Sequence, residues 1–164
     1  MEKALYSNDY SRYIPCTVAN VFQPKIKVES VSVRLLGWKS TLYWNIATLG
    51  KAKVYVVYDG GRMVHLSVVI RGKGKFSFLE KNDIEIGSCW THPEYRGLGI
   101  YPAVLSTIIQ KELSEGGVAY MIIAETNQPS QNGVAKVGFE KTGDYIEKDK
   151  LKRYYIKRQR ERKS

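Results

Sequence analysis

The sequence predicts a single α/β domain of the α+β kind, in which a central mixed, mostly antiparallel sheet with one parallel strand pair is flanked by helices. Three observations predict it. Two segments rich in strand-forming residues, 54–58 and 63–70, are joined by a D-G-G turn at 59–61, which is typical of a β-hairpin. A helical apolar pattern follows the glycine-rich stretch 96–101, and the apolar segment 118–124 follows that helix. A strand, a helix and a second strand joined at this length are expected to give a parallel pair.

Length and composition favour one globular domain over residues 1–164. A chain of 164 residues can fill one core well, and 43% hydrophobic residues is ordinary for a globular protein. No apolar run reaches about 18 residues, the length that a membrane-spanning helix needs, and the first residues lack the apolar centre of a signal peptide. Two cysteines, Cys16 and Cys89, are too few for a disulfide framework or a zinc site. We therefore expect a cytoplasmic protein with reduced cysteines and no bound metal.

The net charge of +10 is concentrated at one end of the chain. From Lys150 to Ser164 there are eight Lys or Arg residues and one acidic residue, so this segment carries +7 and the residues before it carry only +3. A basic tail at 158–164 could contact nucleic acid or an anionic membrane. The favoured interpretation is a solvated chain end.

The first 50 residues carry the weakest pattern. Residues 26–35 alternate like a strand, and residues 41–49 favour a short helix that ends at Gly50. Three aromatic residues lie close together in the sequence here: Trp38, Tyr43 and Trp44. In a small domain such aromatic side chains belong more often to the core than to a binding site. We expect helical or mixed structure in this part of the chain.

A glycine-rich turn follows the next strand. Residues 84–91 alternate like a strand, Gly97 and Gly99 follow, and apolar residues then recur at helical spacing from 104 to 113. Glycines let the main chain approach a ligand, and the free N–H groups of a helix's first turn attract negative charge. The pattern predicts a phosphate-binding turn before a helix of about four turns, ended by Gly116-Gly117. The glycine spacing matches neither the dinucleotide-binding motif G-x-G-x-x-G nor the phosphate-binding loop G-x-x-x-x-G-K-[ST], so both are excluded.

The remainder of the chain adds a short helix and two strands. Residues 118–124 are apolar without alternation, as expected of a strand covered on both faces. A short helix is expected between 127 and 139, and residues 140–145 and 151–157 are strand candidates around a polar turn. From residue 52 the expected order is three strands, helix, strand, helix and two strands.

Two motifs carry a resemblance to a known family. Residues 96–100, Arg-Gly-Leu-Gly-Ile, with the lead-in 91–95, resemble the [QR]-x-x-G-x-[GA] signature of the GNAT acyltransferase superfamily. Tyr101 departs from it, since the family usually has Gly or Ala there. Residues 127–139 fit the family's second motif in a variant form, N-x-x-S-x-x-G-x-x-K-x-G-F, in which Val134 stands where many relatives have a Tyr that protonates the leaving thiolate. The variant motifs are similar to those of family members associated with bacterial surface-polysaccharide synthesis.

The resemblance spans about residues 52–157 and implies a GNAT-like domain with an acyltransferase activity. Such a domain transfers an acetyl group directly from acetyl-CoA to a primary amine, and a mildly basic body suits the phosphates of coenzyme A. A small-molecule amine, an amino sugar first among them, is the leading acceptor, and a protein or peptide amine is an alternative. A second alternative is a catalytically impaired binding module that uses the basic tail, as the replacement at Val134 and the +7 terminus suggest. The oligomeric state is left open between monomer and homodimer.

The resemblance also implies the residues that hold acetyl-CoA. Main-chain N–H groups of the turn, with the Arg side chain nearby, are expected at the pyrophosphate; the residues concerned are Arg96, Gly97, Leu98, Gly99, Ile100 and Tyr101. The main chain at Trp90 and Thr91 is expected beside the pantetheine. Asn127 and Ser130 are expected to contact the cofactor and to assist the departing thiolate. The ring of Tyr101 is expected to pack against the apolar stripe of the helix.

A general base is sought on the strand that precedes the turn. Strand alternation places Glu85 opposite Ile84 and Ile86 and on the same side as Gly87, Cys89 and Thr91. Glu85 is the first choice for the base, and a carboxylate that only orders the site is the alternative. The weaker candidates are His65 and His92. Covalent catalysis by the Cys89 thiol is disfavoured because no paired His is evident.

Overall fold

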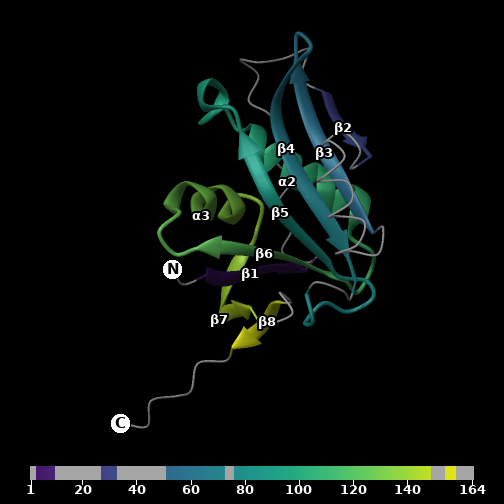
Figure 1. The fold of residues 1–164 in the computed structure, drawn as a ribbon, viewed down its shortest axis with the longest axis vertical. Coiled ribbons are helices and arrows are strands. Elements are labelled where there is room, and N and C mark those ends of the chain that lie inside the picture. Colours follow the sequence, from purple (N-terminus) through teal and green to yellow (C-terminus); the bar gives the residue numbers. More distant parts are fainter. Residues whose placement is uncertain (1–2, 10–26, 33–50, 73–75, 149–153, 158–164) are drawn as a thin grey trace.

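The computed structural model describes residues 3–9, 27–32, 51–72, 76–148 and 154–157. Within these residues eight strands form one sheet in the order β2-β3-β4-β5-β6-β1-β7-β8 (Figure 1). The strands are β1 (Lys3–Asp9), β2 (Lys27–Val31), β3 (Ala52–Asp59), β4 (Arg62–Arg71), β5 (Ile84–Thr91), β6 (Val118–Ala124), β7 (Glu140–Lys148) and β8 (Tyr154–Lys157). The helices are the 3-10 helix η4 (Pro93–Tyr95), α2 (Ile100–Glu112) and α3 (Gln128–Ala135).

The β3–β4 hairpin is confirmed. Its turn is made by Gly60 and Gly61, whose φ angles are 53° and 85°. Positive φ at both central residues matches the right-handed twist of the two strands, and glycine adopts it without steric cost. The hairpin continues into β5, which pairs antiparallel with β4.

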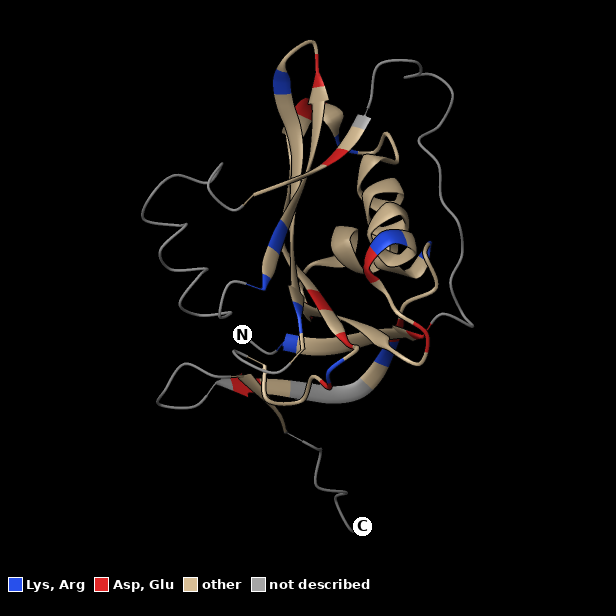
Figure 2. Cartoon of the chain, turned by 90° about the vertical axis from the view of Figure 1, so that its right-hand side faces the viewer, with Lys and Arg blue, Asp and Glu red and all other residues tan. Residues whose placement is uncertain are grey.

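Helices α2 and α3 lie on one side of the sheet (Figure 2). The apolar stripe predicted for α2 is buried against this face, because Val104, Leu105, Ile108 and Ile109 are all 0% exposed. The helix ends at Glu112, earlier than the predicted stop at Gly116-Gly117. Leu113 takes an extended conformation as the C-cap, and the Arg71 guanidinium donates to the main-chain oxygen of Glu112, which satisfies a terminal carbonyl.

The predicted parallel pair is also confirmed, but it is short. Between β5 and β6 only Ile84↔Ala119 and Glu85↔Tyr120 are paired. Beyond these residues the two strands diverge, as Figure 1 shows. The divergence opens the sheet on the side where the glycine turn lies.

The N-terminal strand β1 was not predicted. It lies between β6 and β7, and it pairs antiparallel with both. The predicted strand at 26–35 is found as β2, Lys27–Val31. The expected helix at 41–49 and the three aromatic residues of that region lie outside the described residues, as do Cys16 and the basic tail. No helix of the described part is long and apolar enough to cross a membrane.

Candidate functional site

The glycine turn presents free main-chain donors at the start of α2. Gly97 and Gly99 have φ angles of 78° and 79°, a conformation that side chains rarely adopt. Gly99 is the N-cap of α2 and supplies no side-chain acceptor. No hydrogen bond recorded among the described residues uses the N–H groups from Gly97 to Tyr101. These donors, at the positive end of a helix dipole, can bind an anion.

The turn opens into a cavity of about 460 Å³ between the end of β5, the first turn of α2 and helix α3. The cavity is lined by Cys89, Trp90, Thr91, Tyr95, Arg96, Gly97, Gly99, Ile100, Tyr101, Pro102, Asn127, Pro129, Ser130, Asn132, Gly133 and Lys136. Both family-like motifs thus contribute to one cavity, although about 30 residues separate them in the sequence. The structure brings them together because β5 and β6 are neighbours whose following segments lie at the same edge of the sheet.

A β-bulge at Ser88 changes which face of β5 the following side chains occupy. Leu66 pairs with Trp90 while Val68 pairs with Gly87, so two residues of β5 oppose one residue of β4. Ser88 has a φ angle of 49°, the only positive φ of a non-glycine residue in the described part. The alternation that holds before Ser88 is therefore reversed after it.

This bulge corrects the prediction for the faces of β5. Glu85 pairs with Ile70, and its Oε1 lies 2.6 Å from where a Cβ of Gly87 would stand. Glu85 and Gly87 therefore share the face opposite α2. Cys89 and Thr91, predicted to lie beside them, face the α2 side instead: Cys89 packs against the core that contains α2.

A chain of polar side chains runs along that side of β4 and β5, buried at His65 and Ser67 and half-buried at Thr91 and Cys89. His65 contacts the Thr91 hydroxyl through Nδ1 at 2.8 Å and the Ser67 hydroxyl through Nε2 at 2.9 Å. Ser67 in turn donates to the Cys89 sulfur at 3.2 Å. Burial lowers the pKa of His65 to about 4, and it raises the pKa of Cys89 to about 12. At neutral pH the imidazole and the thiol are both uncharged, so Cys89 is a poor nucleophile.

Tyr101 fits its position because Gly133 lies opposite its ring. A Cβ at Gly133 would stand 2.6 Å from Cδ1 of Tyr101 and 2.8 Å from Cε1. The Tyr101 hydroxyl lies 3.9 Å from Sδ of Met121, on β6. The ring packs against the apolar core as predicted. Burial raises the pKa of Tyr101 well above 10, so the hydroxyl stays protonated.

The second motif places its residues unequally. Asn127 caps α3, and its Oδ1 accepts from the Ser130 N–H at 3.2 Å. Ser130 is half-buried and lines the cavity. Val134, at the position of the usual Tyr, is 0% exposed within the core and does not reach the cavity.

Of the residues expected at the cofactor, all but Leu98 line the cavity, and Leu98 packs against the core. Glu85, the expected base, does not line the cavity. Lys136 lines the cavity and was not nominated from the sequence. Its place in the second motif was the signal that could have found it. His92 lies outside the cavity and accepts from the Glu94 N–H at the start of η4.

Solved structures with a similar fold come from several sources. An acetyltransferase of the GNAT family from Colwellia psychrerythraea has a TM-score of 0.59 at 14% identity, over 86% of this chain and 53% of that one. A GCN5-related N-acetyltransferase from Kribbella flavida has a TM-score of 0.53 at 12% identity, over 86% and 55%. A glucosamine N-acetyltransferase region of a fungal multi-domain β-N-acetylglucosaminidase has a TM-score of 0.55 at 12% identity, over 95% and 20%.

These likenesses concern the fold, and this chain spans about half the length of the first two structures. No curated protein matches its sequence. The sequence model described as the acetyltransferase (GNAT) family matches residues 28–139, more than half of the chain. This match covers the hairpin, the glycine turn and both motifs. The chain therefore belongs to the acetyltransferase (GNAT) family.

Proposed function

We propose that this protein is an N-acetyltransferase that moves an acetyl group directly from acetyl-CoA to the primary amine of a small acceptor. One observation carries the proposal: the free N–H groups of the glycine turn open into a cavity of about 460 Å³ where β5 and β6 diverge. A cavity of roughly 300–1,000 Å³ suits a small molecule. The donors suit a pyrophosphate.

The hydrogen-bond donors that line the cavity suit the phosphate groups of acetyl-CoA. Main-chain N–H groups from Gly97 to Tyr101 would hold the pyrophosphate. Two cations line the same cavity, Arg96 and Lys136, and they would add charge-assisted hydrogen bonds. Arg96 is oriented by a hydrogen bond of 3.1 Å from its Nε to the main-chain oxygen of Thr91. Trp90 and Thr91 would then lie beside the pantetheine.

Two proton transfers are required of the protein. The acceptor amine is an ammonium at neutral pH and must lose a proton before it attacks. We assign this step to Glu85, which is 5% exposed on the face opposite α2, so that the acceptor would approach from that face. The neutral Cys89 thiol supports direct transfer over a covalent route.

The departing thiolate needs a hydrogen-bond donor on the cavity side. Val134 cannot provide one, because it is buried and apolar. We assign this role to Ser130, positioned by Asn127 through the cap of α3. Tyr101, whose hydroxyl stays protonated, also lines this cavity and is the second candidate for the role.

An amino sugar is the acceptor that we propose. The variant motifs resemble those of members associated with surface polysaccharides, and one structure with a similar fold is described as a glucosamine N-acetyltransferase region. A protein amine would need the same chemistry at the thioester. Thiol release from acetyl-CoA separates the two: we expect kcat/KM for glucosamine to exceed that for a peptide amine by about tenfold or more. The reverse ranking would refute the acceptor and leave the cofactor proposal intact.

Calorimetry with acetyl-CoA tests the cofactor proposal. We expect the wild type to bind, and Gly99→Glu to lose binding, because a carboxylate would then occupy the anion site at a left-handed φ angle. Gly116→Glu is the matched control, since Gly116 also has a positive φ angle of 73° but lies in open space away from the cavity. Equal binding by the wild type and Gly99→Glu, or no binding by the wild type, would show the proposal to be wrong.

A further inference from the structure

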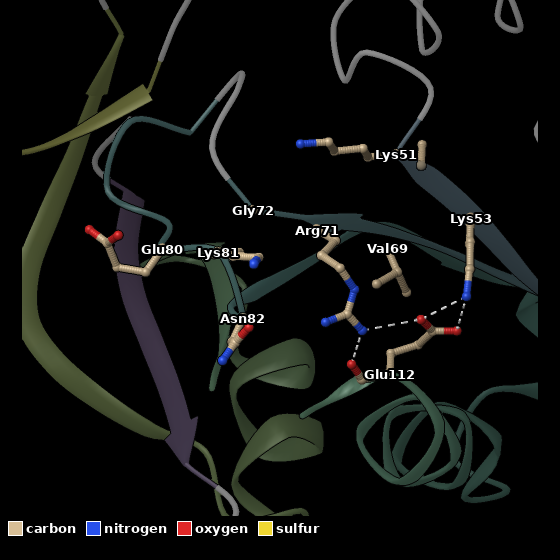
Figure 3. Close-up of a pocket in the computed structure, with 10 residues that line it drawn as sticks. Lys51, Lys53, Val69, Arg71, Gly72, Glu80, Lys81, Asn82 and Glu112 are labelled. Atoms are coloured by element: carbon tan, nitrogen blue, oxygen red, sulfur yellow. Dashed lines mark hydrogen bonds and ion pairs between the residues drawn. The ribbon is translucent and has the colours of Figure 1, made fainter. Parts of the chain in front are cut away.

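A second and larger cavity lies near the C-terminal end of α2. Its volume is about 660 Å³, and it is lined by Lys51, Ala52, Lys53, Val69, Arg71, Gly72, Glu80, Lys81, Asn82 and Glu112 (Figure 3). Helix α2 has 13 residues, so about 18 Å of helix separates this cavity from the glycine turn. We call it the basic hollow, because four cationic side chains line it against two carboxylates.

The floor of the basic hollow is a fixed ionic network around Glu112. Its carboxylate accepts from Lys53 Nζ at 2.9 Å and from the Tyr55 hydroxyl at 2.6 Å, and Arg71 lies 3.5 Å away. Glu112 is only 6% exposed, and hydrogen bonds from Tyr55 and Lys53 hold its pKa below the usual value despite its burial. The carboxylate is therefore ionised and already neutralised within the protein.

Arg71 also covers the negative end of the helix. Its guanidinium donates to the main-chain oxygen of Glu112 and to the Ser114 hydroxyl, the latter at 3.3 Å. The last carbonyls of α2 would otherwise oppose an anion in this place. With Arg71 held in this way, the floor presents a positive surface.

Two further ammonium groups reach the basic hollow from separate segments. In Figure 3 Lys51 extends over it from the start of β3, and Lys81 reaches it from the loop before β5. No ion pair or hydrogen bond is recorded for either side chain among the described residues. Glu80, the remaining carboxylate, points away from Arg71 in the same view. Four cations against two carboxylates leave an excess of positive charge around the basic hollow, and a bound anion would relieve the repulsion among the cations.

We propose that the basic hollow binds a compact polyanion, a small molecule with two or more negative charges such as those of phosphate esters or polycarboxylates. Lys51 and Lys81 bind it directly, and the amide of Asn82 donates from the same loop. The network of Lys53, Arg71 and Glu112 forms a rigid floor beneath it. The volume admits a ligand larger than phosphate itself, within the range of about 300–1,000 Å³ that is usual for small-molecule sites.

Inorganic pyrophosphate and citrate are the probes that test this site in the full chain. At constant ionic strength, amide NMR signals of Ala52 and Gly72 report on the basic hollow, and those of Gly97 and Gly99 report on the glycine turn. We expect saturable shifts at Ala52 and Gly72 with at least one probe. The two probes distinguish phosphate from carboxylate recognition.

Matched variants decide the outcome. The double variant Lys51→Gln with Lys81→Gln should weaken binding at the hollow by about tenfold or more, since two charge-assisted contacts are lost. Lys111→Gln removes an exposed charge from α2 outside both cavities and should leave it unchanged. Shifts confined to Gly97 and Gly99, or equal binding by the double variant and the wild type, would overturn the proposal. Acetyl-CoA binding is read at separate signals, so its failure would leave this result untouched.

Discussion

His65 shows how a buried polar residue can be satisfied within a sheet. It is 0% exposed, and its two ring nitrogens contact the hydroxyls of Ser67 and Thr91. A hydroxyl can donate or accept, so a neutral ring is satisfied in either tautomer. Neither of these two partners is a carboxylate that could balance the charge of a protonated ring. Because burial therefore disfavours the charged form, the pKa of His65 is lowered to about 4.

This shift predicts a loss of stability in mild acid. The unfolded chain binds a proton near pH 6.5, while folded His65 does so only near 4. Its contribution is therefore complete above about pH 6.5 and is lost progressively as the pH falls towards 4. Between about pH 7.5 and pH 5 we expect the free energy of unfolding to fall by about 2 kcal/mol on this account.

Urea unfolding at these two pH values measures the effect. His65→Asn should remove most of this decrease, whereas His92→Asn, which changes the other histidine of the chain, should retain it. An unchanged pH dependence in His65→Asn would contradict the assignment.

At the scale of elements, the contact between α2 and α3 explains why Tyr101 of the first motif and Gly133 of the second occur together. Tyr101 takes the place of a small residue, and Gly133 provides the room for its ring. Gly133→Ala should destabilise the protein by about 1–3 kcal/mol, because the new methyl group overlaps the ring. In a Tyr101→Ala background the same change should be neutral or stabilising, since Ala favours a helix over Gly by about 1 kcal/mol.

A double-mutant cycle in urea measures this coupling. Gly116→Ala is the control: it strains a glycine with a φ angle of 73° that has nothing within 4 Å, so it should cost the same in both backgrounds. An equal cost of Gly133→Ala in the two backgrounds would rule out the proposed contact.

Local patterns predicted the elements whose partners are near in the sequence. The β3–β4 hairpin, helix α2 and the β5–β6 pair were all found, because turn glycines and apolar periodicity depend on adjacent residues. β1 was missed, since its pairing with β7 joins residues more than 130 positions apart and no local pattern encodes it.

The candidate site was predicted as far as its motifs reach. The glycine turn, except for Leu98, and Ser130 line the cavity. The prediction that Glu85 and Cys89 share one face of β5 was wrong, because strand alternation assumes an unbroken strand and the bulge at Ser88 interrupts it. The basic hollow was not anticipated, since its cations come from four separate positions that only the folded chain brings together.

At the scale of the whole molecule, β1 connects two parts of the sheet. On one side lie β2 to β6, and on the other lie β7 and β8. Seven residues of β1 pair with β6. Asn8 Nδ2 adds a buried hydrogen bond of 2.8 Å to the main-chain oxygen of Val137, before β7. The N-terminal strand is therefore expected to control whether β7 and β8 remain attached.

Leu5→Asp tests this role, because Leu5 is 1% exposed in the middle of β1. A charge buried there should cost about 3 kcal/mol or more. Lys3→Asp alters an exposed residue of the same strand, whose Nζ lies 5.9 Å from the ring centroid of Tyr154. This substitution should cost no more than about 1 kcal/mol. In hydrogen exchange, the amides of β7 and β8 should lose protection in Leu5→Asp before those of β3 and β4, because the connecting strand is weakened between them. A uniform loss across all strands would show that the sheet opens as one unit and that β1 has no special role in joining its parts.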